Sequence, residues 1–481
     1  MDLRAALLRQ LDSRSERLAV SLGASNVSYG ELALRVSDFA SIFVKETSPV
    51  ALLAEKGPET YGAVLALFFT GRAAALISTT QPAARALSQI RACGAATLAF
   101  GPRAKAFADE VVGLGGVEPL ELAAARGTYV DLGSFNVASE AIQYIAFTSG
   151  TTTEPKAVPI SYGNFSALMS RLEKIFMFKG SDRFSQTYPL NFDPALADIF
   201  SCLSVGGCLF PLEEKNRYDI FEFIQSNELT VWSSVPTLAE LNFARAKEPL
   251  IPSLKTTIFT GESLSRETAV KWGRAAENSE IYNFYGPVET TVWATYSKWS
   301  GTIEGERVPI GKPLRGLAAR VCGEDGKPVR KGQTGELIVS GDQVFSGYLN
   351  GEKTGQEYRT GDLVFEDEKG DLHWTGRRDF QFKIAGQRFE PFEIEEILKE
   401  KLKFAFCFLV PVDGPSGRPE QTVLFADRPT ELEDVRSALH NGVPAAVIPT
   451  RIFVLRDPPN TASGKVDRRK LQESAAGLIK H

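Results

Sequence analysis

Residues Tyr144–Ser161 read YIAFTSGTTTEPKAVPIS, a stretch that is dense in hydroxyl side chains. A short apolar segment, YIAF, runs directly into glycine and hydroxyl residues that end near Lys156. In such a loop, backbone N–H groups and side-chain hydroxyls can converge on phosphate oxygens, with the lysine as a point charge. The spacing fits neither the Walker A pattern nor G-x-G-x-x-G. Taken alone, it predicts a strand followed by either a phosphate loop or an ordinary surface loop.

Short apolar runs alternate with longer helical patterns around this stretch. The runs expected as strands lie at 50–55, 141–147, 230–235 and 255–260. A helix is expected over 161–178, with Ser161 as its N-cap. The apolar run from Ala63 is broken by Gly71 and Arg72, far short of the roughly 20 residues of a membrane span, and predicts a buried helix feeding a buried strand. This alternation indicates α/β architecture with largely parallel sheets.

After Val308 the sequence pattern changes to short β segments separated by glycines. The stretches at 323–328 and 366–371 have the composition of hairpin turns. From Phe380 a strand, a turn and a helix open a smaller unit, which ends in a lysine-bearing loop. We therefore expect a large domain over 1–378 and a small one over 379–481.

Composition excludes several classes of protein. The chain has 481 residues, 43% of them hydrophobic. This is enough to form at least two domains whose cores do not need a disulfide or a metal ion for stability. A net charge of -5 and the lack of a basic block argue against nucleic acid as a partner. Five scattered cysteines and three histidines argue against structural zinc and for a reducing compartment. The charged N-terminus does not resemble a signal peptide, so we expect a cytoplasmic protein that is not bound to a membrane.

Four further motifs follow the loop in order. They are NFYGPVETT (Asn283–Thr291), YRTGD (Tyr358–Asp362), GRRDFQFKIAGQRFEPFEIE (Gly376–Glu395) and NTASGKVDRRKL (Asn460–Leu471). With the loop, this set resembles the adenylate-forming (AMP-binding) enzymes: acyl-CoA synthetases, luciferases and adenylation domains of nonribosomal peptide synthetases. The resemblance implies a large N-terminal domain of mostly parallel sheets flanked by helices plus a distorted β-barrel, and a small mobile α+β C-terminal domain.

The resemblance also implies the activity. A carboxylate attacks the α-phosphate of ATP, pyrophosphate leaves, and a thiol then captures the acyl-adenylate. By resemblance, Tyr285 stacks on adenine beside Asn283, and Asp362 accepts the ribose hydroxyls near Arg377. The expected nucleotide-binding set is Thr148, Ser149, Gly150, Thr151, Thr152, Lys156, Gly261, Asn283, Phe284, Tyr285, Gly286, Asp362 and Arg377.

The expected catalytic groups are a metal ligand and a mobile lysine. The resemblance places Mg²⁺ on Glu289, and Lys465 against the substrate carboxylate, where it would orient attack and stabilise developing charge. Asp379 would be the hinge about which the C-terminal lid rotates. That rotation would replace Lys465 with a thiolation loop formed by Lys383, Gly386 and Arg388. Turns and solvated carboxylates of ordinary structural kind are the alternatives for these motifs.

The acid substrate is expected to be an amino acid. Asp193, in PLNFDPALADIF, stands where amino-acid-activating members place a carboxylate for the substrate ammonium; a helix-capping role is the alternative. Fatty and aryl acids carry no ammonium, and a carboxylate without a counter-charge is costly in an apolar pocket. By motif matching, the site would be lined by Asp193, Pro194, Ala197, Ser233, Ile258, Thr260, Phe284, Val292 and Trp293. These walls favour a small side chain, such as that of alanine, glycine or serine, of undecided chirality.

The flanking stretches resemble stand-alone D-alanine carrier protein ligases. No phosphopantetheine-bearing serine motif or condensation motif is recognisable, so we expect the thiol to come from a separate protein or from CoA, and a ligase that serves a separate carrier protein fits best. We also expect a monomer. The chain departs from the family pattern in two places, with Thr153 and Ala157 where glycine is usual and Val288 where threonine is usual. These departures are expected to affect catalytic efficiency and not the fold. The rival interpretations are an acyl-CoA synthetase for a small acid and a degenerate nucleotide-binding protein.

Overall fold

The structure is a computed structural model. It describes residues 2–13, 16–148, 155–246, 249–302, 305–349, 351, 353–378, 382–384, 387–389, 391–414, 418–439, 443–459 and 466–479. Two compact units emerge: the larger takes in most of the chain up to Thr375, and the smaller contains the residues from Gly376 onward. The functional division into an adenylation core and a lid stays a prediction.

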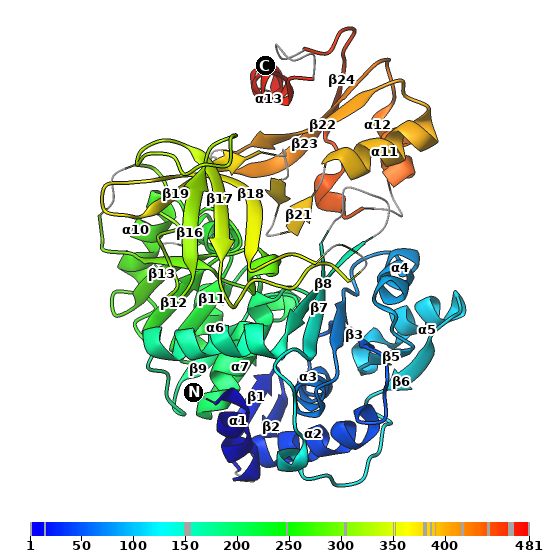
Figure 1. The fold of residues 1–481 in the computed structure, drawn as a ribbon, viewed down its shortest axis with the longest axis vertical. Helices are drawn as coiled ribbons and strands as arrows, with labels where there is room; N and C mark the ends of the chain where they lie inside the picture. The colour runs from blue at the N-terminus through cyan, green and yellow to red at the C-terminus, as the bar shows by residue number, and fades with distance from the viewer. Residues whose placement is uncertain are drawn as a thin grey trace. The chain divides into compact units, whose positions relative to one another are not determined.

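A nine-stranded mixed sheet forms one layer of the larger unit (Figure 1). Its strand order is β15-β14-β13-β12-β11-β9-β10-β1-β2. The run from β13 to β1 is parallel, and the strands at both edges are antiparallel. The strands are β1 (Leu18–Leu22), β2 (Ser25–Ser28), β9 (Arg183–Gln186), β10 (Cys208–Pro211), β11 (Val231–Ser234), β12 (Thr256–Phe259), β13 (Glu280–Tyr285), β14 (Thr295–Lys298) and β15 (Lys312–Pro313).

A second sheet has six strands in the order β6-β5-β3-β4-β7-β8. They are β3 (Val50–Leu53), β4 (Ala74–Ile77), β5 (Thr97–Phe100), β6 (Glu118–Glu121), β7 (Ile142–Thr148) and β8 (Lys156–Ser161). The pairs joining β6 through β7 are parallel. Strands β3, β7, β11 and β12 confirm the strand predictions made from apolar runs.

The helices of the larger unit join these strands. They are α1 (Leu3–Asp12), α2 (Tyr29–Phe43), α3 (Pro58–Thr70), α4 (Ala83–Cys93), α5 (Lys105–Gly113), α6 (Tyr162–Ile175), α7 (Pro194–Val205), α8 (Ile220–Ser226), α9 (Pro236–Phe243) and α10 (Arg266–Ala275). Short 3-10 turns are η1 (Pro102–Ala104), η2 (Leu132–Ser134), η3 (Glu214–Asn216) and η4 (Val288–Thr290). Ser161 caps α6, its hydroxyl accepting from the Asn164 N–H while the Asn164 side chain accepts from the Ser161 N–H. This reciprocal cap confirms the predicted helix start.

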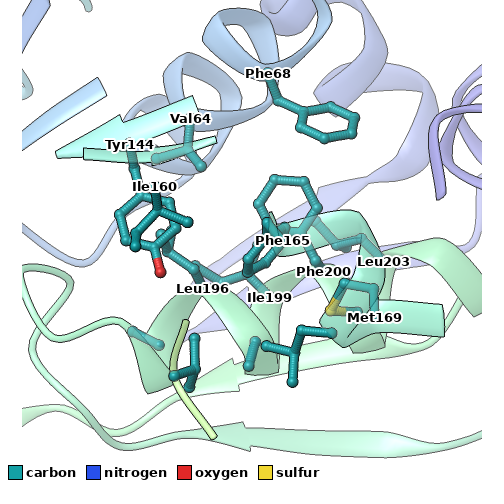
Figure 2. Close-up of a cluster of buried hydrophobic side chains, with 14 of the residues drawn as sticks. Val64, Phe68, Tyr144, Ile160, Phe165, Met169, Leu196, Ile199, Phe200 and Leu203 are labelled. Atoms are coloured by element: carbon teal, nitrogen blue, oxygen red, sulfur yellow. The ribbon is translucent and has the colours of Figure 1, made fainter. Parts of the chain in front are cut away.

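One hydrophobic core connects the two large sheets. Helix α6 packs on β8 and α7, and α7 packs on β9 and β10. Figure 2 shows side chains from α3, α6 and α7 meeting Tyr144 of β7 and Ile160 of β8. Phe200 lies at the centre, with ring centroids 5.0 Å from Phe68 and 5.1 Å from Phe165. Because α7 begins directly after Asp193, this packing fixes the position of the predicted substrate aspartate.

The third sheet lies where a distorted barrel was expected, and it carries the YRTGD motif. It is four-stranded, in the order β16-β17-β18-β19, with β16 (Ala318–Cys322), β17 (Gly335–Ser340), β18 (Glu357–Glu366) and β19 (Leu372–Arg377). Asp362 lies in the middle of β18 and Trp374 in β19.

The smaller unit is α+β. A hairpin of β20 (Phe382–Ile384) and β21 (Gln387–Phe389) precedes α11 (Pro391–Leu402). A three-stranded sheet follows, with β22 (Cys407–Asp413), β23 (Pro419–Ala426) and β24 (Arg451–Val454). The remaining elements are α12 (Leu432–Leu439), η5 (Ala445–Val447) and α13 (Arg468–Ile479). The predicted strand, turn and helix are thus present, with a second short strand before the helix.

All five cysteines are buried as free thiols. Among the described helices, none combines the length and apolar character needed to cross a bilayer.

Candidate active site

The predicted phosphate loop connects β7 to β8. Its residues Ser149, Gly150, Thr151 and Thr152 lie outside the described part of the chain, as does Thr153. Thr148 is described only as the last residue of β7. Lys156 opens β8 and is half-buried. The roles of these residues as phosphate ligands therefore remain predictions.

Lys156 and Glu289 meet around a tyrosine that sequence patterns did not single out. The Lys156 ammonium lies 5.6 Å from the centre of the Tyr348 ring. The Tyr348 hydroxyl donates to Glu289 Oε1 at 3.1 Å. The backbone joins the same segments, because the Phe345 N–H donates to the Glu289 carbonyl at 2.9 Å. The structure thus brings the predicted phosphate lysine and the predicted metal carboxylate together.

Glu289 fits the magnesium role predicted for it. Its side chain is 0% exposed and supplies hard carboxylate oxygens, one of them oriented by Tyr348. Mg²⁺ is usually held by one or two protein carboxylates together with substrate phosphates and waters, so a single buried glutamate suffices. Within the described ranges, no group of three or more His, Cys, Asp or Glu side chains forms an all-protein metal cage.

Strand β13 carries the predicted adenine residues. Asn283 Nδ2 donates to the carbonyls of Val308 and Pro309 at 3.2 and 2.9 Å. Both amide hydrogens are therefore used, and the acceptor Oδ1 is the group left to meet an exocyclic amine. The Tyr285 hydroxyl donates to Asp362 Oδ2 at 2.6 Å. The predicted adenine and ribose residues are therefore in direct contact.

Asp362 has a second donor that sequence reasoning missed. The Trp374 indole N–H donates to Asp362 Oδ1 at 2.9 Å, and the Asp362 side chain is buried. Each carboxylate oxygen has a second lone pair, so both can still accept a ribose hydroxyl. Arg377 ends β19 and is half-buried. Its predicted contact with the ribose remains a prediction.

Two predicted glycines are explained by local geometry. Gly261, after β12, has a φ of 87°, a left-handed conformation that favours glycine. At Gly286, a Cβ would lie 2.6 Å from the Val292 carbonyl oxygen and 2.7 Å from Trp293 Cα. Gly286 therefore lets β13 approach the Val292–Trp293 segment, which carries two predicted substrate residues.

The predicted amino-acid residues converge at the carboxyl ends of the central strands. Asp193 Oδ2 accepts a hydrogen bond from the Val292 N–H at 3.1 Å. The Asp193 side chain makes no capping bond at the start of α7, so the helix-capping alternative is not supported. Pro194 is the first residue of α7 and Ala197 is buried one turn later. Burial raises the pKa of the Tyr144 phenol well above its usual value, and the neighbouring Asp193 carboxylate adds to that rise.

The other residues predicted to line the amino-acid site contact one another. Trp293 Nε1 donates to Thr260 Oγ1 at 3.1 Å, and the Trp293 ring lies 4.6 Å from that of Phe284. Ser233 and Ile258 are register partners on β11 and β12. All of these side chains are buried.

In the smaller unit, the predicted Lys465, Asp379 and Gly386 lie outside the described residues. Lys383 lies in β20 and the Arg388 backbone in β21. Helix α13, which starts shortly after Lys465, is anchored by Arg468, which donates to Glu395 Oε1 and Oε2 at 2.7 and 2.5 Å. Glu395 also accepts from the Leu409 N–H at 2.7 Å, which links α13 to α11 and β22.

Comparisons with known proteins agree with this arrangement. The family model described as "AMP-binding enzyme" matches residues 7–349. A D-alanine--D-alanyl carrier protein ligase of Bacillus licheniformis is 27% identical, with 98% of this chain and 99% of the relative covered. The ligase of that name from Listeria monocytogenes is 33% identical over 68% of this chain and 69% of its own length.

Solved structures show the same fold. The Vibrio cholerae adenylation domain AlmE, in complex with glycyl-adenosine-5'-phosphate, superposes with a TM-score of 0.89 at 24% identity, over 99% of this chain and 98% of that one. The resemblance inferred from the ordered motifs is confirmed. The chain belongs to the AMP-binding enzyme family and is an adenylate-forming ligase.

Proposed function

We propose that this enzyme activates a small amino acid with ATP and transfers it to a carrier protein. The first step would form an aminoacyl-adenylate and pyrophosphate. The second would transfer the aminoacyl group to the phosphopantetheine thiol of a separate carrier protein, releasing AMP.

The position of Asp193 is the observation that carries the amino-acid assignment. Its carboxylate is oriented by the Val292 N–H at 3.1 Å, beside the aromatic wall formed by Trp293 and Phe284. A charge-assisted hydrogen bond to an ammonium group is stronger than one between neutral groups, and a low-polarity surrounding strengthens it further. An acid lacking an amine would leave that interaction unused.

A small side chain suits the walls. Trp293 is held both by its hydrogen bond to Thr260 and by its ring contact with Phe284. Because two contacts fix the indole, it would fill space rather than swing aside for a bulky substrate. Ala197, Ser233 and Thr260 supply only small side chains, which favours alanine, glycine or serine.

The nucleotide would be oriented by residues of the larger unit. Tyr285 would stack on adenine, Asp362 would accept the ribose hydroxyls, and Lys156 would face the phosphates. Mg²⁺, when bound at Glu289, would neutralise phosphate charge as pyrophosphate leaves. Lys465 would orient the attacking carboxylate and stabilise charge at the α-phosphate. Rotation about Asp379 would then exchange Lys465 for the loop formed by Lys383, Gly386 and Arg388.

The names of the relatives support a carrier protein as the acceptor. The Bacillus licheniformis ligase, named for transfer to a D-alanyl carrier protein, aligns with this chain over almost its entire length. By analogy with that relative, we propose a separate phosphopantetheinylated carrier protein as the acceptor.

The deciding experiment is ATP/pyrophosphate exchange over D- and L-amino acids, β-amino acids and simple carboxylic acids. We expect exchange with one small amino acid and its loss in Asp193→Ala. Exchange only with acids lacking an amine, unaffected by Asp193→Ala, would favour an acyl-CoA synthetase. ATP binding without exchange for any acid would favour a non-catalytic nucleotide-binding protein.

A further inference from the structure

The turn that follows η4 is strained. Thr291 has φ 61° and ψ 83°, and Val292 also has φ 61°. Both are β-branched, and for such residues a positive φ is a true outlier. Only two other non-glycine residues in the described part of the chain, Glu228 and Lys403, have positive φ, and neither is β-branched. Conformations of this kind persist only where the surroundings enforce them, and they gather at functional sites.

This turn carries two groups of the proposed amino-acid site. The Val292 N–H points at Asp193 Oδ2, at 3.1 Å, and the next residue, Trp293, reaches Thr260 with its indole. The direction of the Val292 N–H depends on the backbone torsions of Thr291 and Val292. The strained conformation therefore sets the direction of one hydrogen bond that orients the Asp193 carboxylate.

A single buried amide holds the turn from the other side. Gln343 is 0% exposed, and its Nε2 lies 2.8 Å from the Trp293 carbonyl oxygen, 3.2 Å from that of Thr290 and 3.4 Å from that of Thr291. In return, the Thr291 hydroxyl donates to the Gln343 carbonyl at 2.6 Å. The Gln343 side chain thus contacts the carbonyls of Thr290, Thr291 and Trp293, and its backbone carbonyl accepts from the Thr291 hydroxyl.

The orientation of the amide is itself fixed. Arg171 Nη1 donates to Gln343 Oε1 at 3.1 Å, and the same guanidinium donates to the Arg315 carbonyl and to Asp342. Arginine has donors only, so the amide oxygen must face Arg171 and the amide nitrogen must face the carbonyls. A glutamate at this position would place a second acceptor against those carbonyl oxygens.

We infer that Gln343 is a positioning residue of the amino-acid site: it holds the strained Thr291–Val292 turn so that the Val292 N–H orients Asp193 toward the substrate amine. This inference rests on the proposed function. In this role Gln343 would act through the backbone of Thr291 and Val292 and not by binding the substrate or the nucleotide.

The test measures exchange kinetics of Gln343→Ala and Gln343→Glu. We expect the KM for the amino acid to rise by about 10- to 100-fold, as displacement of a positioning contact by about 1 Å does elsewhere, while the KM for ATP stays unchanged. The preference for the amino acid over its deamino analogue should fall in parallel. Gln356→Ala, at an exposed glutamine, is the matched control and should leave both KM values unchanged.

A purely structural role predicts a different pattern. If Gln343 had only a structural role, its variants would have a lower melting temperature and a lower kcat, and the KM values for the amino acid and for ATP would change equally or not at all. That pattern would overturn the inference. If Gln343→Ala does not fold, Thr291→Val carries the same test, because it keeps the side-chain size and removes only the hydroxyl bond to Gln343. In the double variant with Asp193→Asn, the loss of amine preference should not add to that of Asp193→Asn alone.

Failure of the proposed function is separable from failure of the inference. If the wild-type enzyme exchanges only with acids that lack an amine, the proposed function fails. The inference, which concerns the substrate amine, then fails with it, whatever the Gln343 variants do. If the wild-type enzyme does activate an amino acid and the Gln343 variants keep its KM, the inference alone fails.

Discussion

Replacing Trp374 with phenylalanine tests whether Asp362 is held ready for the ribose. The indole N–H donates to Asp362 Oδ1 at 2.9 Å, while Tyr285 donates to Oδ2 at 2.6 Å. These two donors fix the carboxylate plane. Phenylalanine keeps an aromatic ring near the Arg307 guanidinium, which lies 5.5 Å from the Trp374 ring centre. The substitution therefore removes mainly the hydrogen bond.

The magnitude follows from the kind of bond that is lost. Hydrogen bonds to charged groups contribute about 1.5 to 3 kcal/mol. Trp374 is half-buried, so water can partly replace the lost donor, and we take the lower end of that range. A loss of about 1.4 kcal/mol corresponds to tenfold weaker binding. We expect Trp374→Phe to raise the Kd for ATP by about tenfold.

The assay compares ATP with 2',3'-dideoxy-ATP by titration calorimetry. The tenfold loss should appear with ATP and disappear with the dideoxy analogue, which has no hydroxyls for Asp362 to accept. Trp299→Phe is the matched control, because Trp299 is also half-buried and its indole makes no hydrogen bond to the described part of the chain. An equal loss with both nucleotides would refute the reasoning, since it would show that the indole acts by packing. Unchanged ATP binding would refute it as well.

Three further predictions concern other parts of the molecule. Lys465→Ala should lower adenylation by about 10²- to 10³-fold yet still transfer a preformed adenylate to the carrier; equal loss in both half-reactions would reject its role. Tyr348→Phe should raise the Mg²⁺ concentration needed for half-maximal exchange, because Glu289 loses its orienting donor; an unchanged Mg²⁺ dependence would count against Glu289 as the ligand. Burial raises the pKa of the Glu55 carboxyl from 4.5 to about 7. Between these pH values the folded state keeps a proton that the unfolded chain has lost, so the stability of the fold falls as pH rises from 4.5 to about 7. Glu55→Gln should flatten this part of the melting-temperature profile, and an unaltered slope between these pH values would contradict the assigned shift.

The fold was predictable because its signals are local. Runs such as 50–55 and 255–260 are apolar on both faces, as buried parallel strands require, and they became β3 and β12. The Ser161 cap follows from a side chain that reaches only three residues ahead. The third sheet was less well predicted, because glycine-punctuated β segments indicate hairpins but not how a sheet closes.

Site residues could be predicted from the sequence only where they lie within a short motif. Glu289, Asp362 and Asp193 each lie in a short stretch whose residue types point to their role. The residues that support them do not: Tyr348 is 59 residues from Glu289, and Gln343 is 50 from Trp293. A tyrosine or glutamine in a β-rich region carries no local pattern that distinguishes a positioning residue from a surface one. These contacts arise from tertiary packing, which periodicity does not encode.

The contacts made by Gln343, Phe345 and Tyr348 all reach a single segment, residues 283–293. Residues 283–293 carry the proposed adenine, metal and amino-acid groups in sequence, from Tyr285 through Glu289 to Val292. The segment after β17 meets them in turn: Gln343 binds the strained turn, the Phe345 N–H binds the Glu289 carbonyl, and Tyr348 binds the Glu289 carboxylate. Since both segments are short and each contact fixes a different group, a shift of the second segment would displace the metal ligand and the amine-orienting N–H together. The two segments therefore behave as one support, and the amino-acid and Mg²⁺ affinities are expected to respond jointly to changes in its backbone, while single side chains such as Gln343 and Tyr348 separate them.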